Sequence, residues 1–568
     1  MKKIYLFPLL FVAIGMFAQN GKTSNISADN NIRVAFISDA HIQDVVGHPE
    51  LVRSQEAQVQ STRLFNENYF ALLAALDDCA RRGINIVAMP GDLTDDGQIV
   101  AEQCVRKILK SYSDKYGMQF FVTVGNHDPQ SPVSYERTKT DYLGDDGSQV
   151  TISSDATSGA QIIREDLRGS GYFGLTECYA DFGFMPQESF KLWATPYSSY
   201  DADNYSFEQA KKECIIEQRK YKLGNGMDYD ATYVVEPVEG LWLLAIDGAV
   251  HFQKRNGEYK SSALGYNNWQ PARNHVLAWI KTIATAAKQK NKTLIAFCHF
   301  PAADFNDGAD KYISKCWGEE KFDIKRTPSK EITDAIREAG INVHFGGHLH
   351  VNDTGISGDF LVNVQVPSLA MCVPGYKILT INDPQHMDVE TVTLTEVPNF
   401  NSLFGRYQKE YDHDIALGKA PIWSIEALKS KNYQEFCNWH FRDVTRVRFI
   451  PRLIPEVLRQ QITDRNGKEI LALIAPNATA EESMEEWTGF DMLHDLFRLR
   501  YSGELVRGMI PQTRLNQYNK IFDAANAADT SPLIEQIRGI GEMFGCCLNE
   551  EPSINFTIDL EQKKVTAR

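Results

Sequence analysis

Three apolar runs that each end in polar side chains place the strongest constraint on how this chain folds. Residues 32–37, 84–89 and 119–124 are largely apolar, which is typical of strands buried on both faces of a sheet. Helical patterns separate them, over residues 65–82 and 100–113. The alternation of strand and helix predicts an α/β fold with a parallel-rich sheet.

The side chains that follow these runs are able to bind metal ions. The first run is followed by Asp39 and His41, the second by Asp92, and the third by Asn126 and His127. Open α/β sheets place their sites outside the carboxyl ends of the strands. We therefore expect the three groups to converge on one crevice.

Two later stretches add histidines in the same position relative to a strand. An apolar run over residues 293–297 leads to His299, and a run over 341–345 leads to Gly346-Gly347-His348-Leu349-His350. The two glycines allow a sharp turn, so both histidines of that stretch can address neighbouring points. Taken alone, this short motif is equally consistent with two surface histidines in a loop. The metal-binding side chains that follow the three earlier strands favour a role for these histidines in the same site.

The combined set of side chains favours two metal ions over one. A single structural zinc ion needs four ligands, and more candidates than that follow the strands. Oxygen and imidazole ligands without thiolate suit Zn, Mn or Fe. A carboxylate can bridge two ions through its two oxygens, and ions roughly 3.5–4 Å apart form a clamp for phosphoryl displacement.

The order of these motifs resembles that of the calcineurin-like metallophosphoesterase superfamily. The resemblance covers residues 31–397 and rests on Asp39-x-His41, Gly91-Asp92, Gly125-Asn126-His127-Asp128, His299 and Gly346-Gly347-His348-x-His350. It implies an α/β fold in which two sheets form an αββα sandwich. It also implies hydrolysis of phosphate mono- or diesters by a hydroxide between two divalent or mixed-valence ions (Mn, Fe or Zn).

The resemblance also implies a role for each residue. One ion would be held by Asp39, His41 and His350, the other by Asn126, His299 and His348, and both by Asp92. His127 is no ligand in the family and would serve the leaving oxygen as general acid or charge stabiliser. Asp95 stands where protein phosphatases of the superfamily orient this histidine, and a helix cap is an equally weighted interpretation.

Departures from the family pattern bear on the substrate. Asp96 stands where protein phosphatases of the superfamily have an arginine, which removes a bidentate phosphate clamp. No tyrosine lies near Asp95, so the tyrosinate-bound iron of purple acid phosphatases is not expected. The motifs are more similar to bacterial cyclic-nucleotide phosphodiesterase-like members. Phosphodiesterase and phosphomonoesterase or nucleotidase activity both stay open, beside a metal-binding, non-catalytic protein that binds a partner.

The rest of the chain is less informative. Residues 129–232 have a weak pattern and are interpreted as an insertion that covers the crevice or only decorates the surface. Residues 398–568 are predicted to form a second, mostly helical domain of unknown role, with a hairpin at 554–565. The isolated histidines there are more often structural than metal ligands; they are His413, His440 and His494.

The N-terminus and the charge predict an exported protein with a small substrate. Residues 1–18 have the charged, apolar and small-residue parts of a signal peptide, so we expect a periplasmic or secreted protein without a transmembrane segment in the mature chain. Removing Lys2 and Lys3 leaves 57 basic and 74 acidic residues, a net charge of −17. This balance argues against nucleic-acid binding but is compatible with a small phosphoester near metal ions. The ten cysteines match no zinc pattern, leave room for one or two disulfides, and give no oligomeric state.

Overall fold

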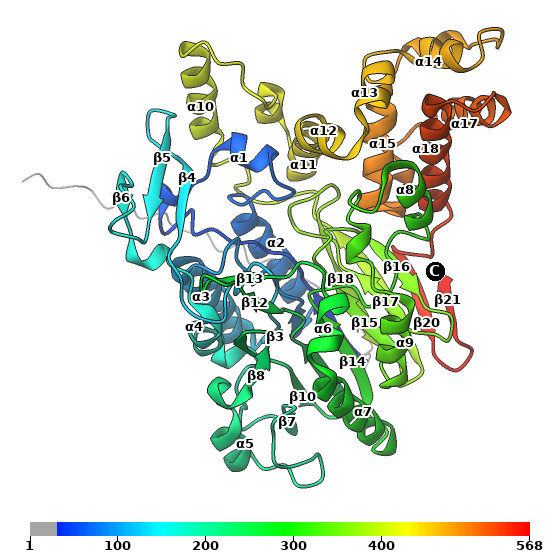
Figure 1. Cartoon of the computed structure of the whole chain (residues 1–568). Helices are drawn as coiled ribbons and strands as arrows, with labels where there is room; N and C mark the ends of the chain where they lie inside the picture. Colours follow the sequence, from blue (N-terminus) through cyan, green and yellow to red (C-terminus); the bar gives the residue numbers. More distant parts are fainter. Residues whose placement is uncertain (1–30) are drawn as a thin grey trace, which may run out of the picture. The chain divides into compact units, whose positions relative to one another are not determined.

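Two seven-stranded sheets form the centre of the molecule in the computed structural model, which describes residues 31–568 (Figure 1). The first sheet has the order β21-β20-β19-β18-β1-β2-β3. Its parallel part consists of β1 (Ile32–Phe36), β2 (Ile86–Met89) and β3 (Gln119–Val122). Its antiparallel part consists of β18 (Gly375–Ile381), β19 (His386–Thr393), β20 (Asn555–Asp559) and β21 (Lys564–Ala567).

The second sheet has the order β16-β17-β15-β14-β11-β10-β7. Four strands run parallel at its centre: β17 (Val362–Gln365), β15 (Val343–Gly346), β14 (Thr293–Cys298) and β11 (Leu241–Ile246). Antiparallel strands flank them: β16 (Asp353–Ile356), β10 (Tyr233–Val238) and β7 (Leu192–Ala194). Every apolar run that the sequence analysis named forms one of these strands.

The two sheets pack face to face, with helices outside them. The ring of Phe36 in β1 stacks on Phe345 in β15, with ring centroids 3.7 Å apart. Alternate residues of β11 face opposite ways: Leu243 joins the core shared with the first sheet, whereas Leu244 packs with α7 (Asn274–Gln289). Residues of α2 (Asn68–Arg81) and α3 (Ile99–Tyr116) join the core of the first sheet. The predicted αββα sandwich is confirmed.

The amphipathic pattern from Pro271 to residue 288 is divided between two helices. Pro271 lies inside α6 (Tyr266–Ala272), and α7 begins only at Asn274. Between them Arg273 leaves the helical conformation, with φ −128° and ψ 38°. Its buried guanidinium bonds the backbone oxygen and the carboxylate of Asp247. This tertiary contact, which the sequence pattern does not show, separates the two helices.

The range predicted as an insertion contains a strand of the second sheet. Residues 129–232 include the small sheet of β4 (Thr138–Leu143), β5 (Gln149–Ser153) and β6 (Ile162–Ile163), and the hairpin of β8 (Lys220–Leu223) and β9 (Gly226–Tyr229). They also include β7, which pairs with β10 at the sheet edge. A strand of three residues is too short for its periodicity to be recognised.

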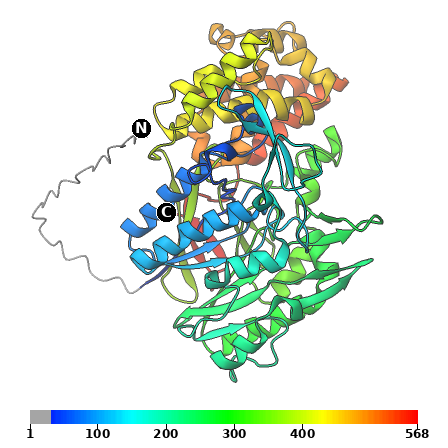
Figure 2. The same cartoon turned by 90° about the vertical axis from the view of Figure 1, so that its left-hand side faces the viewer.

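Helices dominate after residue 397, as predicted, and Figure 2 shows them gathered at one end, drawn from yellow to red. Among the longest are α10 (Phe404–Ala416), α11 (Tyr433–Val444), α15 (Gly489–Ser502), α17 (Gln512–Ala527) and α18 (Pro532–Leu548). The predicted terminal hairpin forms as β20 and β21 and extends the first sheet. Residues 32–568 form one compact unit. A domain boundary near residue 397 stays a prediction.

The three histidines of the helical region are held by contacts within the protein. Buried His440 has Nε2 2.9 Å from the Gln58 carbonyl oxygen, and His494 has Nδ1 3.1 Å from the Thr445 hydroxyl. His413 lies beside the carboxylate of Asp414. None belongs to a group that could hold a metal ion among residues 31–568.

Other predictions concern the membrane and the cysteines. The predicted signal peptide, residues 1–18, lies outside the described residues. Across the described part of the chain, no helix combines the length and apolar character needed to cross a bilayer. All ten cysteines lie in that part, and each is a free thiol.

Candidate metal centre

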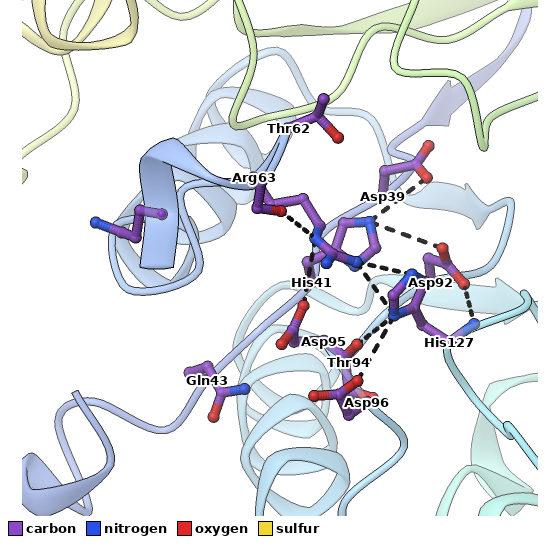
Figure 3. A network of polar contacts seen from close by, with 12 residues as sticks. Asp39, His41, Gln43, Thr62, Arg63, Asp92, Thr94, Asp95, Asp96 and His127 are labelled. Carbon is purple, nitrogen blue, oxygen red and sulfur yellow. Dashed lines mark hydrogen bonds and ion pairs between the residues drawn. The ribbon is translucent and has the colours of Figure 1, made fainter. Parts of the chain in front are cut away.

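The predicted ligands meet where parallel strands of both sheets end. Figure 3 shows three of them, Asp39, His41 and Asp92, together with His127. Asp39 and His41 follow β1, Asp92 follows β2, and Asn126 and His127 follow β3. His299 follows β14, while His348 and His350 follow β15. The aspartates and the four ligand histidines are all buried. The convergence expected from the strand ends is therefore present.

One group of ligands consists of Asp39, His41 and His350. The Nε2 atoms of His41 and His350 are 3.2 Å apart. Asp39 Oδ1 lies 3.4 Å from His350 Nε2 and 3.7 Å from His41 Nε2. Three donor atoms so close together fit one ion, as the family resemblance implies for these residues.

A second group surrounds His299 Nε2. This atom lies 3.1 Å from Asn126 Oδ1, from His348 Nδ1 and from Asp92 Oδ2. The same Asp92 oxygen lies 3.7 Å from His41 Nε2 in the first group. Asp92 is therefore placed between the two groups, as a bridging carboxylate must be.

Backbone carbonyls orient three of the histidines. His299 Nδ1 lies 3.0 Å from the Pro90 oxygen, His348 Nε2 3.0 Å from the Ala263 oxygen, and His350 Nδ1 3.0 Å from the Thr62 oxygen. A carbonyl only accepts hydrogen bonds, so the proton sits on that nitrogen and the other nitrogen faces the site. Metal-ligating histidines are held in this way. The residues present thus fit bound metal ions.

The backbone at the site adopts a conformation that is rare outside glycine. Asp39, His41, Asp92, His348 and His350 have φ angles of 53°, 43°, 48°, 71° and 56°. Such left-handed residues cost about 1–3 kcal/mol each, and they cluster at functional sites. The fold accepts this strain because it turns the side chains into the crevice.

Two motif glycines allow the strand ends to approach each other. A Cβ atom on Gly125 would collide with the Asp92 carboxylate. A Cβ atom on Gly347 would collide with the side chains of Ser38 and Asp39. Both positions therefore require glycine for packing, which explains their place beside the ligands in the sequence.

The electrostatics favour an ionised carboxylate at Asp92, a neutral ring at His41, and a proton on His299 that a metal ion can displace. Burial alone would raise the pKa of Asp92, but His299 and His127 bring it below the usual range. Burial lowers the pKa of His41 to about 4, which keeps that ring neutral. At His299 burial lowers the pKa, but Asp92 raises it more, so a cation there competes with a proton.

His127 stands beside the ligands without joining either group. Its backbone N–H donates to Asp92 Oδ1 at 2.8 Å, and its Nδ1 lies 2.5 Å from the backbone oxygen of Asp95. Arg63 Nη1 lies 2.7 Å from its Nε2. The His127 side chain is 22% exposed, at the open side of the site.

Asp95 lies close to His127, but its carboxylate does not make the contact with His127 that the family resemblance implies. The contact with His127 is made by the Asp95 backbone oxygen, whereas its carboxylate faces Arg53 at 3.0 Å and Lys139 at 3.2 Å. Asp95 also does not cap a helix, since Gln98 is the N-cap of α3. Its carboxylate lies 3.4 Å from Arg63 Nε. It therefore acts on His127 through Arg63 and the backbone.

Three arginines near the ligands were not found from the sequence. A cleft of about 130 Å³ is lined by Arg63, Arg326 and Arg448, together with ligands and His127. They come from a loop after α1 (Gln55–Val59), from η5 (Ile324–Arg326) and from η7 (Thr445–Phe449). Single arginines in separate segments form no motif, so only the folded chain brings them together.

Comparison with family models identifies the chain. A model described as calcineurin-like phosphoesterase matches residues 32–352, a range that includes every predicted ligand. The chain belongs to this family. It is a phosphoester hydrolase, and membership implies a site for two metal ions. The interpretation as a non-catalytic binding protein is accordingly set aside.

Comparison with individual proteins adds little. A search of curated proteins found no match. Among solved structures, a dimetal phosphatase from Danio rerio is 12% identical with a TM-score of 0.29, over 63% of this chain and 95% of that one. Purple acid phosphatase PPD1 from yellow lupin is 12% identical with a TM-score of 0.30, over 64% of this chain and 51% of that one. Since both scores are low, the family match and the sheet topology carry the assignment.

Proposed function

We propose that this phosphoesterase acts on small phosphate esters and prefers a phosphomonoester group. The observation that carries the proposal is the cleft in which Arg63, Arg326 and Arg448 face the two ligand groups. Among the described residues that line this cleft, Asp92 is the only carboxylate. A phosphomonoester carries more negative charge than a diester, so it gains more from these cations.

The two ligand groups would hold the ions that the family requires. Asp39, His41 and His350 would bind one, Asn126, His299 and His348 the other, and Asp92 both. Nitrogen and oxygen donors suit Zn, Mn or Fe. When bound, such ions activate water and offset the charge of the phosphoryl group.

His127 is the candidate for supplying a proton to the leaving oxygen. Its Nδ1–H is held by the Asp95 carbonyl, so Nε2 is the atom available to the substrate. In the free protein Arg63 donates to that Nε2. The substrate must therefore draw Arg63 away before Nε2 can carry and donate a proton. A phosphate group has the charge to do so.

The remaining arginines are available to bind substrate. Arg448 Nη1 donates to the Gln60 backbone oxygen at 2.6 Å, and Arg448 makes no ion pair with any described residue. Arg326 Nε lies 3.4 Å from Asp323 Oδ1. Both guanidinium groups can thus bind an anion without breaking a strong ion pair.

A matched pair of substrates tests the proposal. Protein purified and loaded with Mn²⁺, Zn²⁺ or Fe²⁺ is assayed with 4-nitrophenyl phosphate and with bis(4-nitrophenyl) phosphate. We expect a higher kcat/KM for the monoester, with activity on both lost after chelation. A higher kcat/KM for the diester would overturn the monoester preference but not the family assignment.

We also propose that the protein is exported to the periplasm or beyond the cell. The support is the charged, apolar and small-residue succession in residues 1–18. The N-terminus of protein isolated from the producing cell tests it. A start near Gln19 outside the cytoplasm is expected, and recovery of Met1 from cytoplasmic protein would overturn export.

A further inference from the structure

A second group of acidic side chains shares no residue with the strand-end site, as we call the two ligand groups that Asp92 connects. Asp307 lies between β14 and α8 (Asp310–Trp317), Asp353 begins β16, and Glu550 follows α18. One carboxylate oxygen from each lies within 4.8 Å of the other two. From these residues we propose a second cation site, which binds Ca²⁺ and ties the helical region to the sheets.

Asp353 provides the decisive observation. It is 3% exposed, and neither of its carboxylate oxygens has a hydrogen-bond partner among the described residues. The nearby buried ammonium of Lys377 donates no hydrogen bond to it. Its three hydrogens are used by Asn352 Oδ1, Thr391 Oγ1 and the Ser553 backbone oxygen, at 2.6–2.7 Å. A buried carboxylate without a partner is costly unless a cation meets it.

Carboxylates outnumber guanidinium groups at the cavity. Glu550 Oε1, on a side chain that is 3% exposed, lies 3.1 Å from Arg507 Nη2. Arg500 also lines the cavity, so three carboxylates face two guanidinium groups. Burial raises the pKa of Asp307 to about 7 and that of Glu550 to about 8, and neighbouring carboxylates add to both shifts.

The space between the carboxylates has the size of one ion. Asp307, Asp353 and Glu550 line a cavity of about 10 Å³, roughly the space of one water-sized sphere. Its other walls are formed mainly by apolar side chains, Phe305 and Met543 among them, together with Asn306 and Arg500. This cavity can hold a single ion and little else.

The donor set selects Ca²⁺ among common cations. All three donors are carboxylate oxygens, which hard cations prefer. Ca²⁺ accepts carboxylates in flexible geometry, which suits donors from three separate segments, whereas Mg²⁺ demands a nearly ideal octahedron. Ca²⁺ would connect β16 to the segment between α18 and β20.

Calcium content and thermal stability test this site in the full chain. The protein is stripped of metal, reloaded with Mn²⁺, and then titrated with CaCl₂. We expect one Ca²⁺ per chain by elemental analysis and a Tm that rises with CaCl₂ concentration, as binding to the folded state requires. Asp353→Asn should lose the bound Ca²⁺ and the Tm shift, with an affinity lower by more than about tenfold because ligand charge sets Ca²⁺ affinity.

Two further variants make the result decisive. Asp92→Asn, at the strand-end site, should keep both the bound Ca²⁺ and the Tm shift. Glu550→Gln should behave like Asp353→Asn and replaces it if that variant does not fold. Wild type without Ca²⁺ above background, retention of Ca²⁺ by both cavity variants, or loss of Ca²⁺ by Asp92→Asn would each overturn the proposal.

Discussion

The strand-end site and the carboxylate cavity gather ligands in opposite ways. At the strand ends, histidines and carboxylates come from short motifs that each follow a strand, and backbone carbonyls orient the rings. In the cavity, the candidate ligands are all carboxylates, from segments as far apart as Asp307 and Glu550, and no donor among the described residues satisfies Asp353. The first site lies at an open cleft that a substrate can enter, whereas the second site encloses a single ion. Local motifs mark the first, whereas only packing creates the second.

The largest expected effect separates the two sites directly. Asp92→Asn should weaken binding of both ions by more than about 100-fold, the upper effect of losing even an outer-shell partner. His41→Ala should mainly reduce occupancy of one ion. Metal analysis of the purified variants checks both, and Ca²⁺ content should stay unchanged. Full metal content in Asp92→Asn would remove Asp92 from the site.

The next effect concerns His127, which belongs to the open cleft but to neither ligand group. His127→Ala should lower kcat by about 10²–10⁴-fold, the usual contribution of a general acid, with metal content intact. The loss should be greater for an alkyl phosphate than for 4-nitrophenyl phosphate, since nitrophenolate leaves without a proton. Steady-state rates on both esters decide. An equal loss on both would move His127 out of the acid role.

A smaller effect is expected from the arginines of the cleft. Arg448→Gln should lower kcat/KM for the monoester by about 10–100-fold, the range for a hydrogen bond between charged groups. The loss for the diester should be smaller, because it carries less charge. Arg452→Gln, a neighbour outside the lining of the cleft, is the matched control. Equal losses in the two variants would contradict a substrate contact.

The smallest effect concerns Glu102, a buried carboxyl group that belongs to neither site. Burial raises the pKa of Glu102 to about 8, and Ser170 is its hydrogen-bond partner. Between about pH 4.5 and 8 the unfolded chain releases this proton while the folded chain keeps it. Stability from this group therefore falls with rising pH, by up to about 1.4 kcal/mol per pH unit.

Urea unfolding at pH 5.5 and 7.5 measures that slope. Glu102→Gln should flatten it and raise stability at pH 7.5, with or without CaCl₂. An unchanged slope in the variant would show that Glu102 ionises in the folded protein. If CaCl₂ alone abolished the slope, the pH dependence would come from the cavity carboxylates and not from Glu102.

Several features could be predicted from the sequence because their signals are local. Long apolar runs marked the central strands, and a polar motif directly after each run marked the ligands. Parallel strands end at one edge of a sheet, so the convergence of Asp39, Asp92 and Asn126 followed from topology alone. The family resemblance then implied how the ligands divide between two ions.

Other features depended on contacts between distant segments. Strand β7 was missed because three residues carry no period. The break between α6 and α7 lies at Arg273, whose side chain turns to Asp247. The carboxylate of Asp95 faces arginine and lysine side chains that no motif connects to it.

The tertiary structure alone decided which charges meet. Arg63, Arg326 and Arg448 stand in three unrelated segments, yet they share one cleft. Asp353 and Glu550 are almost two hundred residues apart, yet both are buried in one cavity. A charged residue has no period and no required neighbour in sequence, so its partners are fixed only by the packing of the elements that carry it.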